Sequence, residues 1–383
     1  MTEQTKQVPK RRFKEFENSM PWEQLELREV LKINSGRDYK HLDPGDIPVY
    51  GTGGYMLSVN DKLSVVDGIG IGRKGTIDKP QYLKAPFWTV DTLFFMTPLS
   101  NYDIHFLFSL SQNIKWRQLD ESTGVPSLSK VVIEKVVRNF PSYEEQKRIG
   151  TFFKHLDELI TFHQRKLEKV KALKNAYLSE MFPSEGELVP KRRFAGFTKK
   201  WEEKKMSEIT DIYDGTHQTP KYTRSGIKFV SVENISTLES TKFISRTAYD
   251  NEYSNKQAKK GDVLMTRIGD IGTTRVIETH EPLAYYVTLA LLKPKQINSY
   301  FLAYLISSPA VQKNIWKRTL HIAFPKKINL SEINQIDLLL PTIDEQAKIG
   351  NFFKALDDTI TLHERKLEKL QNLKKAYLHE MFV

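Results

Sequence analysis

Two stretches of the chain carry hydrophobic residues at alternating spacings of four and three positions. The first pattern runs from Leu156 to Met181 and the second from Leu356 to Met381. A repeat of this kind places its side chains along one stripe of a helix and is typical of a coiled-coil seam. The sequence therefore predicts two long helices with these seam residues: Leu156, Ile160, His163, Leu167, Val170, Tyr177, Leu356, Ile360, His363, Leu367, Leu370 and Tyr377.

Both helices also have readable ends. Ser142 with Glu145, and Thr342 with Glu345, have the spacing of a capping box, and Pro183 should end the first helix. About 40 residues at roughly 1.5 Å each make a rod near 60 Å.

The seam is not uniformly apolar. We interpret His163 and His363 as polar residues that set the register of the pair, rather than as ligands or catalysts. Leu173 and Leu178, with their counterparts in the second stretch, widen the apolar stripe. Each helix should therefore bind the other helix and something more.

The two helical stretches belong to an internal repeat. Residues 141–182 and 341–382 align without a gap at an offset of 200, with 26 of 42 positions identical. A shorter repeat joins 8–13 to 189–194, and each copy is followed by Trp-Glu, at Trp22 and Trp201. The segments between these repeats share no run that can be aligned. The chain is thus built twice, with two unlike inserts in two similar frames.

Each insert reads as mixed α and β. Strands and a final helix are expected at 47–50, 63–66, 89–96 and 104–119 in the first insert, and at 227–232, 262–267, 286–292 and 299–318 in the second.

Composition supports a folded protein of two or three domains. The chain has 383 residues, of which 39% are hydrophobic, with 21 Phe and 16 Tyr. Cysteine is absent, which excludes a disulfide framework, a thiolate nucleophile, cysteine-ligated zinc and iron–sulfur clusters. The first twenty residues are polar and basic, and no apolar run approaches the roughly 18 residues of a membrane span. We expect a cytoplasmic protein.

A net charge of +11 suggests a polyanionic partner, but its distribution weakens that argument. The segment 22–140 carries 14 basic and 14 acidic residues. Much of the excess lies in the short runs 10–12 and 191–193, which a linker or a solvated face would explain at least as well as phosphate contact.

The sequence predicts no catalytic residue and no metal site. Gly70–Gly75 has the spacing of a dinucleotide fingerprint, but a β-branched stretch closed by Pro80 follows, where that fold needs a helix. A glycine-rich hairpin that exposes Arg73 and Lys74 fits better. A phosphate-binding lysine loop, a metal-binding helix motif and a nucleophile elbow are also missing.

The inserts do carry donors on expected loops, where they could enter a DNA groove. Arg and Lys suit guanine edges and phosphates, Gln suits adenine, and Thr methyl groups suit thymine. For any one residue a solvated surface role competes with base contact. The candidate DNA-binding residues are Arg73, Lys74, Thr216, His217, Gln218, Lys221, Tyr222, Arg267, Lys326 and Lys327.

This architecture resembles the specificity subunit of type I restriction-modification enzymes over nearly the whole chain. The resemblance rests on Pro-x-x-x-Glu-Gln-x-x-Ile at 141–149 and 341–349, and on the Leu-Lys-x-Ala-Tyr-Leu-x-x-Met-Phe pattern that ends each repeat. The stretches 72–75 and 215–220 also look like parts of its recognition domains. One departure is His321–Pro325, which lacks the glycine of Ser122–Pro126.

The resemblance implies an α+β fold with two mixed α/β target-recognition domains separated by two long antiparallel coiled-coil helices. It divides the chain into a basic N-terminal segment, a first recognition domain, a first long helix, a linker, a second recognition domain and a second long helix, at 1–21, 22–141, 142–182, 183–200, 201–341 and 342–383.

It also implies a function without catalysis in this chain. The two domains would each read one half of a split, asymmetric target in double-stranded DNA. The helices would dock two methylation subunits, which bind S-adenosylmethionine, and restriction/translocase subunits using ATP and magnesium would join the full complex. No cofactor is expected in this chain and no membrane contact. Two alternatives remain open: a coiled-coil protein adaptor without DNA recognition, and an enzyme whose site the motifs do not reveal.

Overall fold

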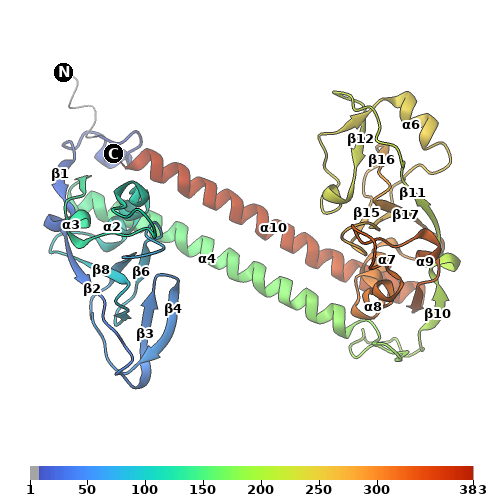
Figure 1. Cartoon of the computed structure of the whole chain (residues 1–383), viewed down its shortest axis with the longest axis horizontal. Coiled ribbons are helices and arrows are strands. Elements are labelled where there is room, and N and C mark those ends of the chain that lie inside the picture. The colour runs from blue at the N-terminus through green and yellow to red at the C-terminus, as the bar shows by residue number, and fades with distance from the viewer. Residues whose placement is uncertain (1–7, 383) are drawn as a thin grey trace. The chain divides into compact units, whose positions relative to one another are not determined.

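The computed structural model describes residues 8–382 and divides the chain into two units (Figure 1). Unit 1 comprises residues 1–165 with 364–383, and unit 2 comprises residues 166–363. Residues 1–7 of the expected basic segment 1–21, and residue 383 of the expected second helix, lie outside the described residues. Each long helix contributes its first part to one unit and its last part to the other.

Unit 1 is a mixed α/β domain with parts of both long helices. Its strands are β1 (Glu23–Glu26), β2 (Leu31–Ser35), β3 (Pro44–Gly51), β4 (Gly54–Val59), β5 (Gly68–Gly72), β6 (Gln81–Leu83), β7 (Trp88–Thr89), β8 (Leu93–Pro98) and β9 (Val137–Phe140). Its shorter helices are α1 (Leu27–Val30), α2 (Ile104–Asn113) and α3 (Lys130–Glu134), with 3-10 turns at Lys14–Phe16 and Trp116–Leu119; the first long helix is α4 (Tyr143–Glu180).

Unit 2 has its strands in a matching order but differs from unit 1 in its shorter helices. Its strands are β10 (Glu202–Lys205), β11 (Thr210–Asp214), β12 (Ile227–Val230), β13 (Phe243–Ile244), β14 (Val263–Thr266), β15 (Thr274–Val276), β16 (Leu283–Tyr285), β17 (Leu289–Pro294) and β18 (Asp337–Leu340). Its helices are α5 (Met206–Ile209), α6 (Arg246–Glu252), α7 (Ser299–Ile306), α8 (Pro309–Arg318) and α9 (Leu330–Asn334), with a 3-10 turn at Val232–Asn234; the second long helix is α10 (Ile343–Met381).

The two unlike inserts share one topology. The four-stranded sheet has the order β2-β8-β5-β6 in unit 1 and β11-β17-β14-β15 in unit 2. The three-stranded sheets are β4-β3-β7 and β13-β12-β16, each with one antiparallel and one parallel pair. An antiparallel pair, β1 with β9 or β10 with β18, closes each domain next to its long helix. The fold is α+β, as the sequence predicts.

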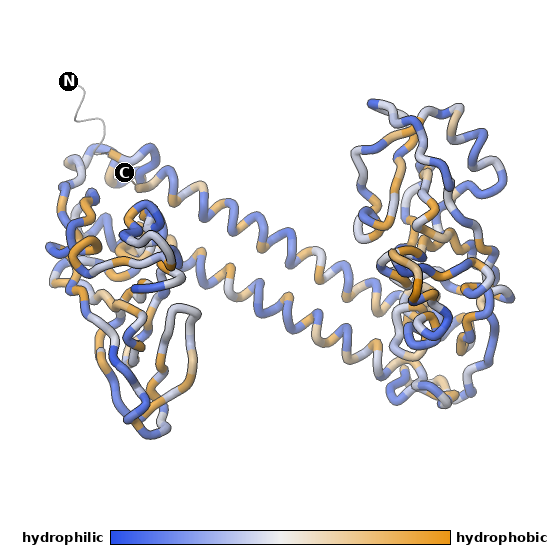
Figure 2. The backbone as a smooth tube through the Cα atoms, in the orientation of Figure 1, coloured by the Kyte–Doolittle hydropathy of each residue, from blue (hydrophilic) through white to orange (hydrophobic). Residues whose placement is uncertain are grey.

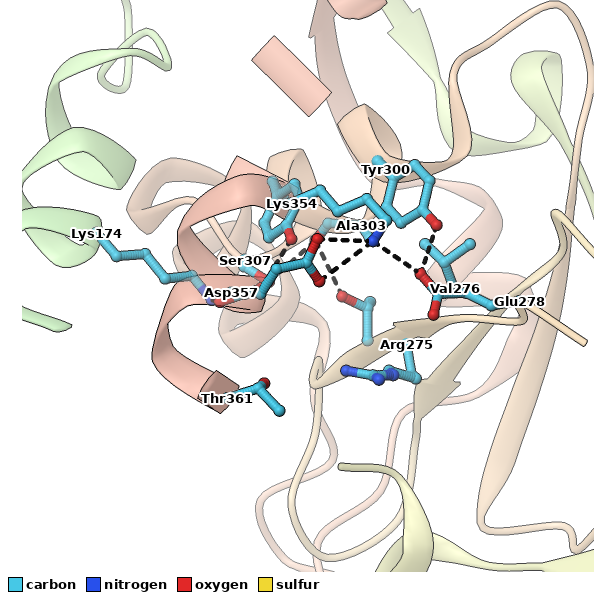
Figure 3. A pocket seen from close by; sticks show the side chains of 13 residues that line it. Lys174, Arg275, Val276, Glu278, Tyr300, Ala303, Ser307, Lys354, Asp357 and Thr361 are labelled. Carbon is cyan, nitrogen blue, oxygen red and sulfur yellow. Dashed lines mark hydrogen bonds and ion pairs between the residues drawn. The ribbon is translucent and has the colours of Figure 1, made fainter. Parts of the chain in front are cut away.

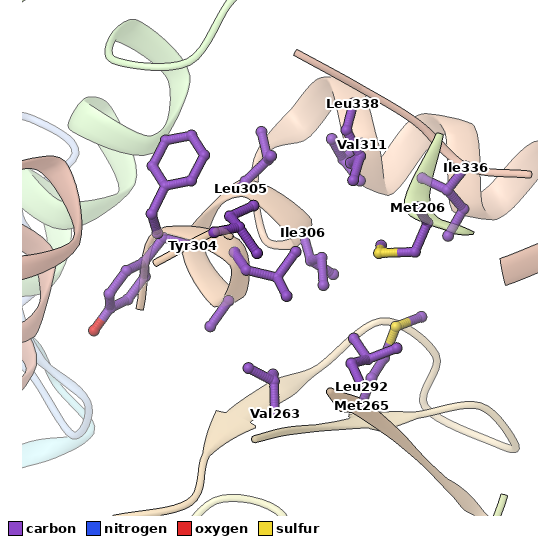
Figure 4. Close-up of a cluster of buried hydrophobic side chains, with 14 of the residues drawn as sticks. Met206, Val263, Met265, Leu292, Tyr304, Leu305, Ile306, Val311, Ile336 and Leu338 are labelled. Carbon is purple, nitrogen blue, oxygen red and sulfur yellow. The ribbon is translucent and has the colours of Figure 1, made fainter. Parts of the chain in front are cut away.

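Hydrophobic burial joins each sheet to the helices. In unit 2, β14 and β17 are buried along most of their length, and their side chains meet α7 and α8 in the cluster drawn in Figure 4. Phe353 of α10 and Phe182 after α4 belong to the same cluster. In unit 1 the corresponding cluster includes Trp22, Phe153 and Phe382. The core of each domain therefore continues into both long helices.

The long helices pair antiparallel within each unit. In unit 1, Asp157 of α4 accepts a hydrogen bond from Lys374 of α10 at 2.5 Å. In unit 2 the same contact joins Lys174 of α4 to Asp357 of α10 at 2.6 Å. Hydrophobic residues recur along both helices (Figure 2). Of the proposed seam residues, Leu156 is buried and all the others are half-buried.

The repeated motif at the start of each helix is a joint between helix and domain. In unit 1, Gln146 donates to the Pro141 carbonyl at 2.9 Å and accepts from the Asp103 amide at 3.2 Å. Asp103 caps α2 by accepting from the Phe106 amide. A Cβ on Gly150 would lie 2.2 Å from Asp103 Oδ1, so only glycine permits this close approach.

Unit 2 repeats the joint with different cap chemistry. Gln346 donates to the Pro341 carbonyl at 3.0 Å and accepts from the Asn298 amide at 3.1 Å. Asn298 caps α7, and a Cβ on Gly350 would lie 2.7 Å from Asn298 Oδ1.

Several local expectations need correction. Residues 63–66 form no strand, and Val65 and Val66 are exposed. The helix expected at 104–119 ends at Asn113, and a separate 3-10 turn follows. The helix expected at 299–318 is two helices, because Pro309, which has no amide hydrogen, begins the second.

Candidate nucleic-acid interface

A pair of hydrogen-bonded loops lies at the end of the interior strand β5 in unit 1. The Leu128 amide donates to the Arg73 carbonyl at 2.9 Å, and the Gly75 amide donates to the Pro126 carbonyl at 2.8 Å. The chain turns from β5 to the antiparallel strand β6, which agrees with the expected hairpin. These bonds engage backbone atoms only and fix the course of the loop. The side chains of Arg73 and Lys74 are exposed. The Arg73 guanidinium lies 5.8 Å from the centre of the Phe94 ring.

Unit 2 builds the same pair of loops after β14. The Ile328 amide donates to the Arg267 carbonyl at 2.9 Å, and the Gly269 amide donates to the Lys326 carbonyl at 2.8 Å. Arg73 and Arg267 thus occupy equivalent backbone positions in domains whose sequences cannot be aligned. The shared framework presents different side chains in the two units.

Arg267 does not present its side chain as the sequence suggests. It is 7% exposed, and its guanidinium donates to the carbonyls of Ile328 and Val287, both at 3.3 Å. Burial lowers the pKa of Arg267, and the Asp214 carboxylate at 3.6 Å acts in the opposite direction. The residue stands on a loop, but these contacts between distant segments turn it inward. Its side-chain contacts hold the loops in place in this structure.

The loop that follows β11 contains further candidates. Thr216 is 6% exposed, and its hydroxyl donates to the Gln218 carbonyl at 3.2 Å, so it differs from the expected accessible donor. His217 is exposed and lies 2.6 Å from the Asp214 carboxylate. Gln218, Lys221 and Tyr222 are also exposed, and Tyr222 is 42% exposed.

Lys326 and Lys327 belong to the second loop of unit 2 and are exposed. The Lys326 ammonium lies 4.5 Å from the centre of the Trp316 ring. The backbone of Lys327 forms isolated β-bridges with Leu320 and with Ile268, and these anchor the loop.

The structure brings the roots of the three candidate loops of unit 2 together. Asp214, at the end of β11, contacts both His217 and Arg267, and Arg267 in turn holds Ile328 at the root of the loop with the two lysines. Arg73 and Lys74 occupy the equivalent edge of unit 1. One edge of each domain therefore carries exposed donors on an anchored framework.

The two basic runs are structural, which sequence reasoning did not foresee. In unit 1 the Arg12 guanidinium donates to both carboxylate oxygens of Glu145, and Arg11 pairs with Glu380 at 2.5 Å. The Glu145 carboxylate therefore pairs with Arg12 and does not form the expected capping box with Ser142. Phe13 packs edge-on against Phe152.

Unit 2 repeats this arrangement. Arg193 donates to both carboxylate oxygens of Glu345, which corrects the second expected capping box, and Arg192 pairs with Glu180 at 2.6 Å. Phe194 contacts Phe352. The signal was present in the sequence, because both copies of the repeat carry Arg-Arg-Phe and Glu-Gln.

An ion-pair cluster ties α10 to α7 and β15 in unit 2 (Figure 3). Tyr304 donates to Asp357 at 2.7 Å, and Tyr300 donates to Glu278 at 2.5 Å. Burial raises the pKa of Tyr300 to about 12, with the Glu278 hydrogen bond adding to the effect. The Tyr300 hydroxyl lowers the pKa of Glu278. All four groups have protein partners, so we interpret the cluster as a structural joint.

The described part of the chain contains no group of three or more His, Asp or Glu side chains placed to hold a metal ion. Within residues 8–382, no helix is both long and apolar enough to cross a membrane.

Two copies of one α/β domain, each with anchored loops that present exposed donors, define a double recognition module. The chain belongs to the family described as type I restriction modification DNA specificity domain, whose model matches residues 20–172 and 198–372. This confirms the resemblance read from the repeat. The chain is a specificity subunit of the type I restriction-modification class.

Individual relatives agree. The chain is 24% identical over 293 residues to the specificity subunit of type I restriction enzyme MjaVIII from Methanocaldococcus jannaschii, covering 72% of this chain and 68% of that protein. Its fold is similar to the S subunit of a type I system from M. genitalium, with a TM-score of 0.76, 15% identity and coverage of 98% and 99%. A chain from a structure describing assembly and conformational transition of the type I system has a TM-score of 0.50, 18% identity and coverage of 93% and 96%.

Proposed function

We propose that the chain reads a split, asymmetric target in double-stranded DNA, with each unit reading one half. The observation that carries this proposal is the shared loop framework. Arg73 and Arg267 have equivalent backbone contacts, yet one side chain is exposed and the other is buried. The two units share one loop framework but present different accessible side chains. We therefore expect them to read two different half-sites. In unit 1 the proposed readers are Arg73 and Lys74; in unit 2 they are His217, Gln218, Lys221, Tyr222, Lys326 and Lys327, with Thr216 and Arg267 in positioning roles.

The long helices would set the spacing between the half-sites. They contain 38 and 39 residues, and a helix of that length is about 57 Å long at roughly 1.5 Å per residue. Half-sites on one face of B-DNA repeat about every 34 Å, so a rod of this length is sufficient for a spacer of a whole turn.

The outer faces of the helices would dock the methylation subunits. Several apolar side chains outside the seam are at least 37% exposed: Leu159, Phe162, Leu173, Leu362 and Leu373. Leu173 and Leu373 occupy equivalent positions of the repeat, as do Phe162 and Leu362. A duplicated apolar face favours two copies of one partner, because each copy of the repeat offers a similar surface.

We assign catalysis and cofactors to those partners. The methylation subunits would bind S-adenosylmethionine, and restriction/translocase subunits would use ATP and magnesium, with no cofactor in this chain. Work on chromosomal DNA would place the complex in the cytoplasm. Incubation of the purified chain with DNA, S-adenosylmethionine, ATP and magnesium should produce neither methylation nor cleavage, and either product would overturn this assignment.

The decisive experiment is binding to duplex DNA, with methylation subunits present, over a range of salt concentrations. DNA recognition predicts a log–log slope of about −0.9 for each phosphate neutralised. A flat response would support a protein adaptor instead. Methylation sequencing of DNA modified by the complex should then give two different half-sites separated by a fixed spacer. A single continuous site, or two identical halves, would contradict the split reading.

A further inference from the structure

Two large apolar side chains project from a short loop of unit 2. Ile322 is 99% exposed and Phe324 is 104% exposed, whereas neighbouring Trp316 is 55% exposed. Single exposed apolar residues are ordinary on protein surfaces. Two fully exposed ones, separated by one residue at the tip of a loop, call for a partner.

The root of this loop is firmly held. The Leu320 amide donates to the Lys327 carbonyl at 2.8 Å, and the Gly269 amide donates to the Lys326 carbonyl at 2.8 Å. Behind the tip, the ring of His321 lies 4.3 Å from that of Trp316. Only the tip extends beyond these contacts, so the two apolar side chains are carried on an anchored support.

The charge around the tip favours a polyanion. No acidic residue occurs between Pro309 and Ser331, and Lys326 and Lys327 stand directly after the tip. Asp270, in the adjacent loop, accepts from the Thr273 hydroxyl at 2.6 Å. An apolar tip flanked by cations suits the DNA duplex, which offers phosphates beside stacked bases.

The equivalent loop of unit 1 differs in both respects. It carries Asp120 and Glu121, and the apolar residue at its tip is Val125, which is 55% exposed. Asp120 accepts from the amides of Ser122 and Ser127, which closes the loop on itself. The projecting aromatic tip is therefore specific to unit 2.

We propose that Ile322 and Phe324 act as a wedge that enters the DNA between two base pairs of the half-site read by unit 2. Apolar side chains inserted at a base step partly unstack it and bend the duplex. This inference rests on the proposed DNA recognition and adds to it a mechanical element. The wedge would favour flexible pyrimidine–purine steps, so it would contribute sequence preference without a hydrogen bond to a base.

The test uses the full chain assembled with its methylation subunits, and a duplex carrying the target found by methylation sequencing. 2-Aminopurine is placed at successive steps of each half-site. Methylation subunits are expected to flip the base they modify out of the duplex, so that position is left out of the comparison. At the remaining steps we expect the fluorescence to rise at one step in the unit 2 half only, and Phe324→Ala to abolish that rise. On the intact duplex, Phe324→Ala should weaken binding on the order of tenfold, as expected for loss of one stacking contact.

A mismatch at the responding step provides an independent measurement. It lowers the cost of unstacking, so it should tighten binding by the unmodified complex and have little effect on Phe324→Ala. Met20→Ala, which removes another exposed apolar side chain, serves as the matched control. Equal thermal melting of both variants verifies folding.

The outcomes separate the two proposals. If the complex shows no salt-dependent DNA binding, the proposed function fails. If it binds its target but no step responds and Phe324→Ala binds normally, the wedge alone is wrong. Loss of methylation subunits from Phe324→Ala with unchanged DNA affinity would identify the tip as a protein contact and also overturn the wedge.

Discussion

Arg12 donates to both carboxylate oxygens of Glu145, at 2.7 and 2.6 Å, across 133 residues of sequence. Their side chains are 5% and 1% exposed, so this pair is sealed where the N-terminal segment meets α4. Arg193 and Glu345 reproduce the contact in unit 2, with side chains 12% and 0% exposed. The basic runs thus close each domain onto its helix.

Removing one partner of such a pair should destabilise its unit strongly. Arg12→Ala leaves the Glu145 carboxylate buried without its cation, at a cost of about 3–5 kcal/mol. Urea unfolding followed by circular dichroism would measure the loss. Arg11→Ala is the matched control, because the Arg11–Glu380 pair is largely exposed and solvent screening should leave it with little effect on stability. Equal effects of the two substitutions would contradict the structural role of Arg12.

The glycines of the repeated joint provide a second test. Alanine normally stabilises a helix interior by about 1 kcal/mol relative to glycine. At Gly150 the added methyl would lie 2.2 Å from Asp103 Oδ1 and 2.6 Å from the Phe106 amide nitrogen, so we expect a net loss of about 1–3 kcal/mol from overpacking. Gly350→Ala should behave similarly. Thermal unfolding against the exposed control Asn351→Ala would show the effect, and a stabilised Gly150→Ala would refute the joint.

The sequence was sufficient to predict the two long helices but not the strand topology of the two domains. A seam every three or four residues is a local pattern, and the half-buried positions of α4 and α10 follow it. By contrast, the common topology of the inserts was invisible. Gly70 of β5 and Leu264 of β14 occupy equivalent positions in the two sheets, although their side chains differ. Many side-chain combinations can fill one arrangement of strands. Strand order depends on pairing between distant segments, which no local window contains.

The candidate site shows the same limit. Sequence reasoning placed Arg73, Lys326 and Lys327 on loops, where the structure also finds them exposed. It treated Arg267 in the same way, although hydrogen bonds to Ile328 and Val287 bury that side chain. Loop membership could be read from glycine and proline patterns, but the direction of a side chain depends on long-range contacts.

The ion-pair cluster of unit 2 predicts a dependence of stability on pH at both ends of the scale. Burial raises the pKa of Tyr300 to about 12 from its ordinary value near 10, so its contribution is present below pH 10 and is lost as the pH rises through 12. The Tyr300 hydroxyl lowers the pKa of Glu278, so that contribution is present above the ordinary value near 4.5 and is lost as the pH falls through the depressed one.

Two variants separate these contributions. Lys354, at 3.4 Å, also faces Glu278, and Glu278 is half-exposed, so screening will reduce the size of both effects. Urea unfolding would measure the free energy of unfolding of each variant across pH. The difference between Tyr300→Phe and the unmodified chain should shrink as the pH rises from 10 to 12. Glu278→Gln should approach it in the acid range. Parallel curves over the whole range would show that the cluster is not coupled to stability.

The seam predicts a further separation between pairing and docking. Leu167→Asp together with Leu367→Asp puts charge at half-buried seam positions and should disrupt the antiparallel pairing, reducing assembly of the complex. Lys169→Asp changes charge on an exposed position of α4 and should leave pairing intact. Leu159→Asp should instead weaken binding of methylation subunits, because Leu159 is 47% exposed. Size-exclusion chromatography with light scattering would measure assembly, and full assembly of the double seam variant would contradict the coiled coil.

The proposal that the long helices set the spacing between the half-sites makes the most direct prediction. Deleting residues 164–170 and 364–370 together removes one heptad from each helix and preserves the seam, since seven residues complete two turns of a coiled coil. Each rod should shorten by about 10 Å, equivalent to roughly three base pairs of B-DNA. Methylation sequencing should therefore return the same two half-sites with a shorter spacer. Replacing both heptads with others that keep the seam residues is the control and should preserve the spacer. If the deletion complex methylates at the original spacing, the long helices do not set the distance.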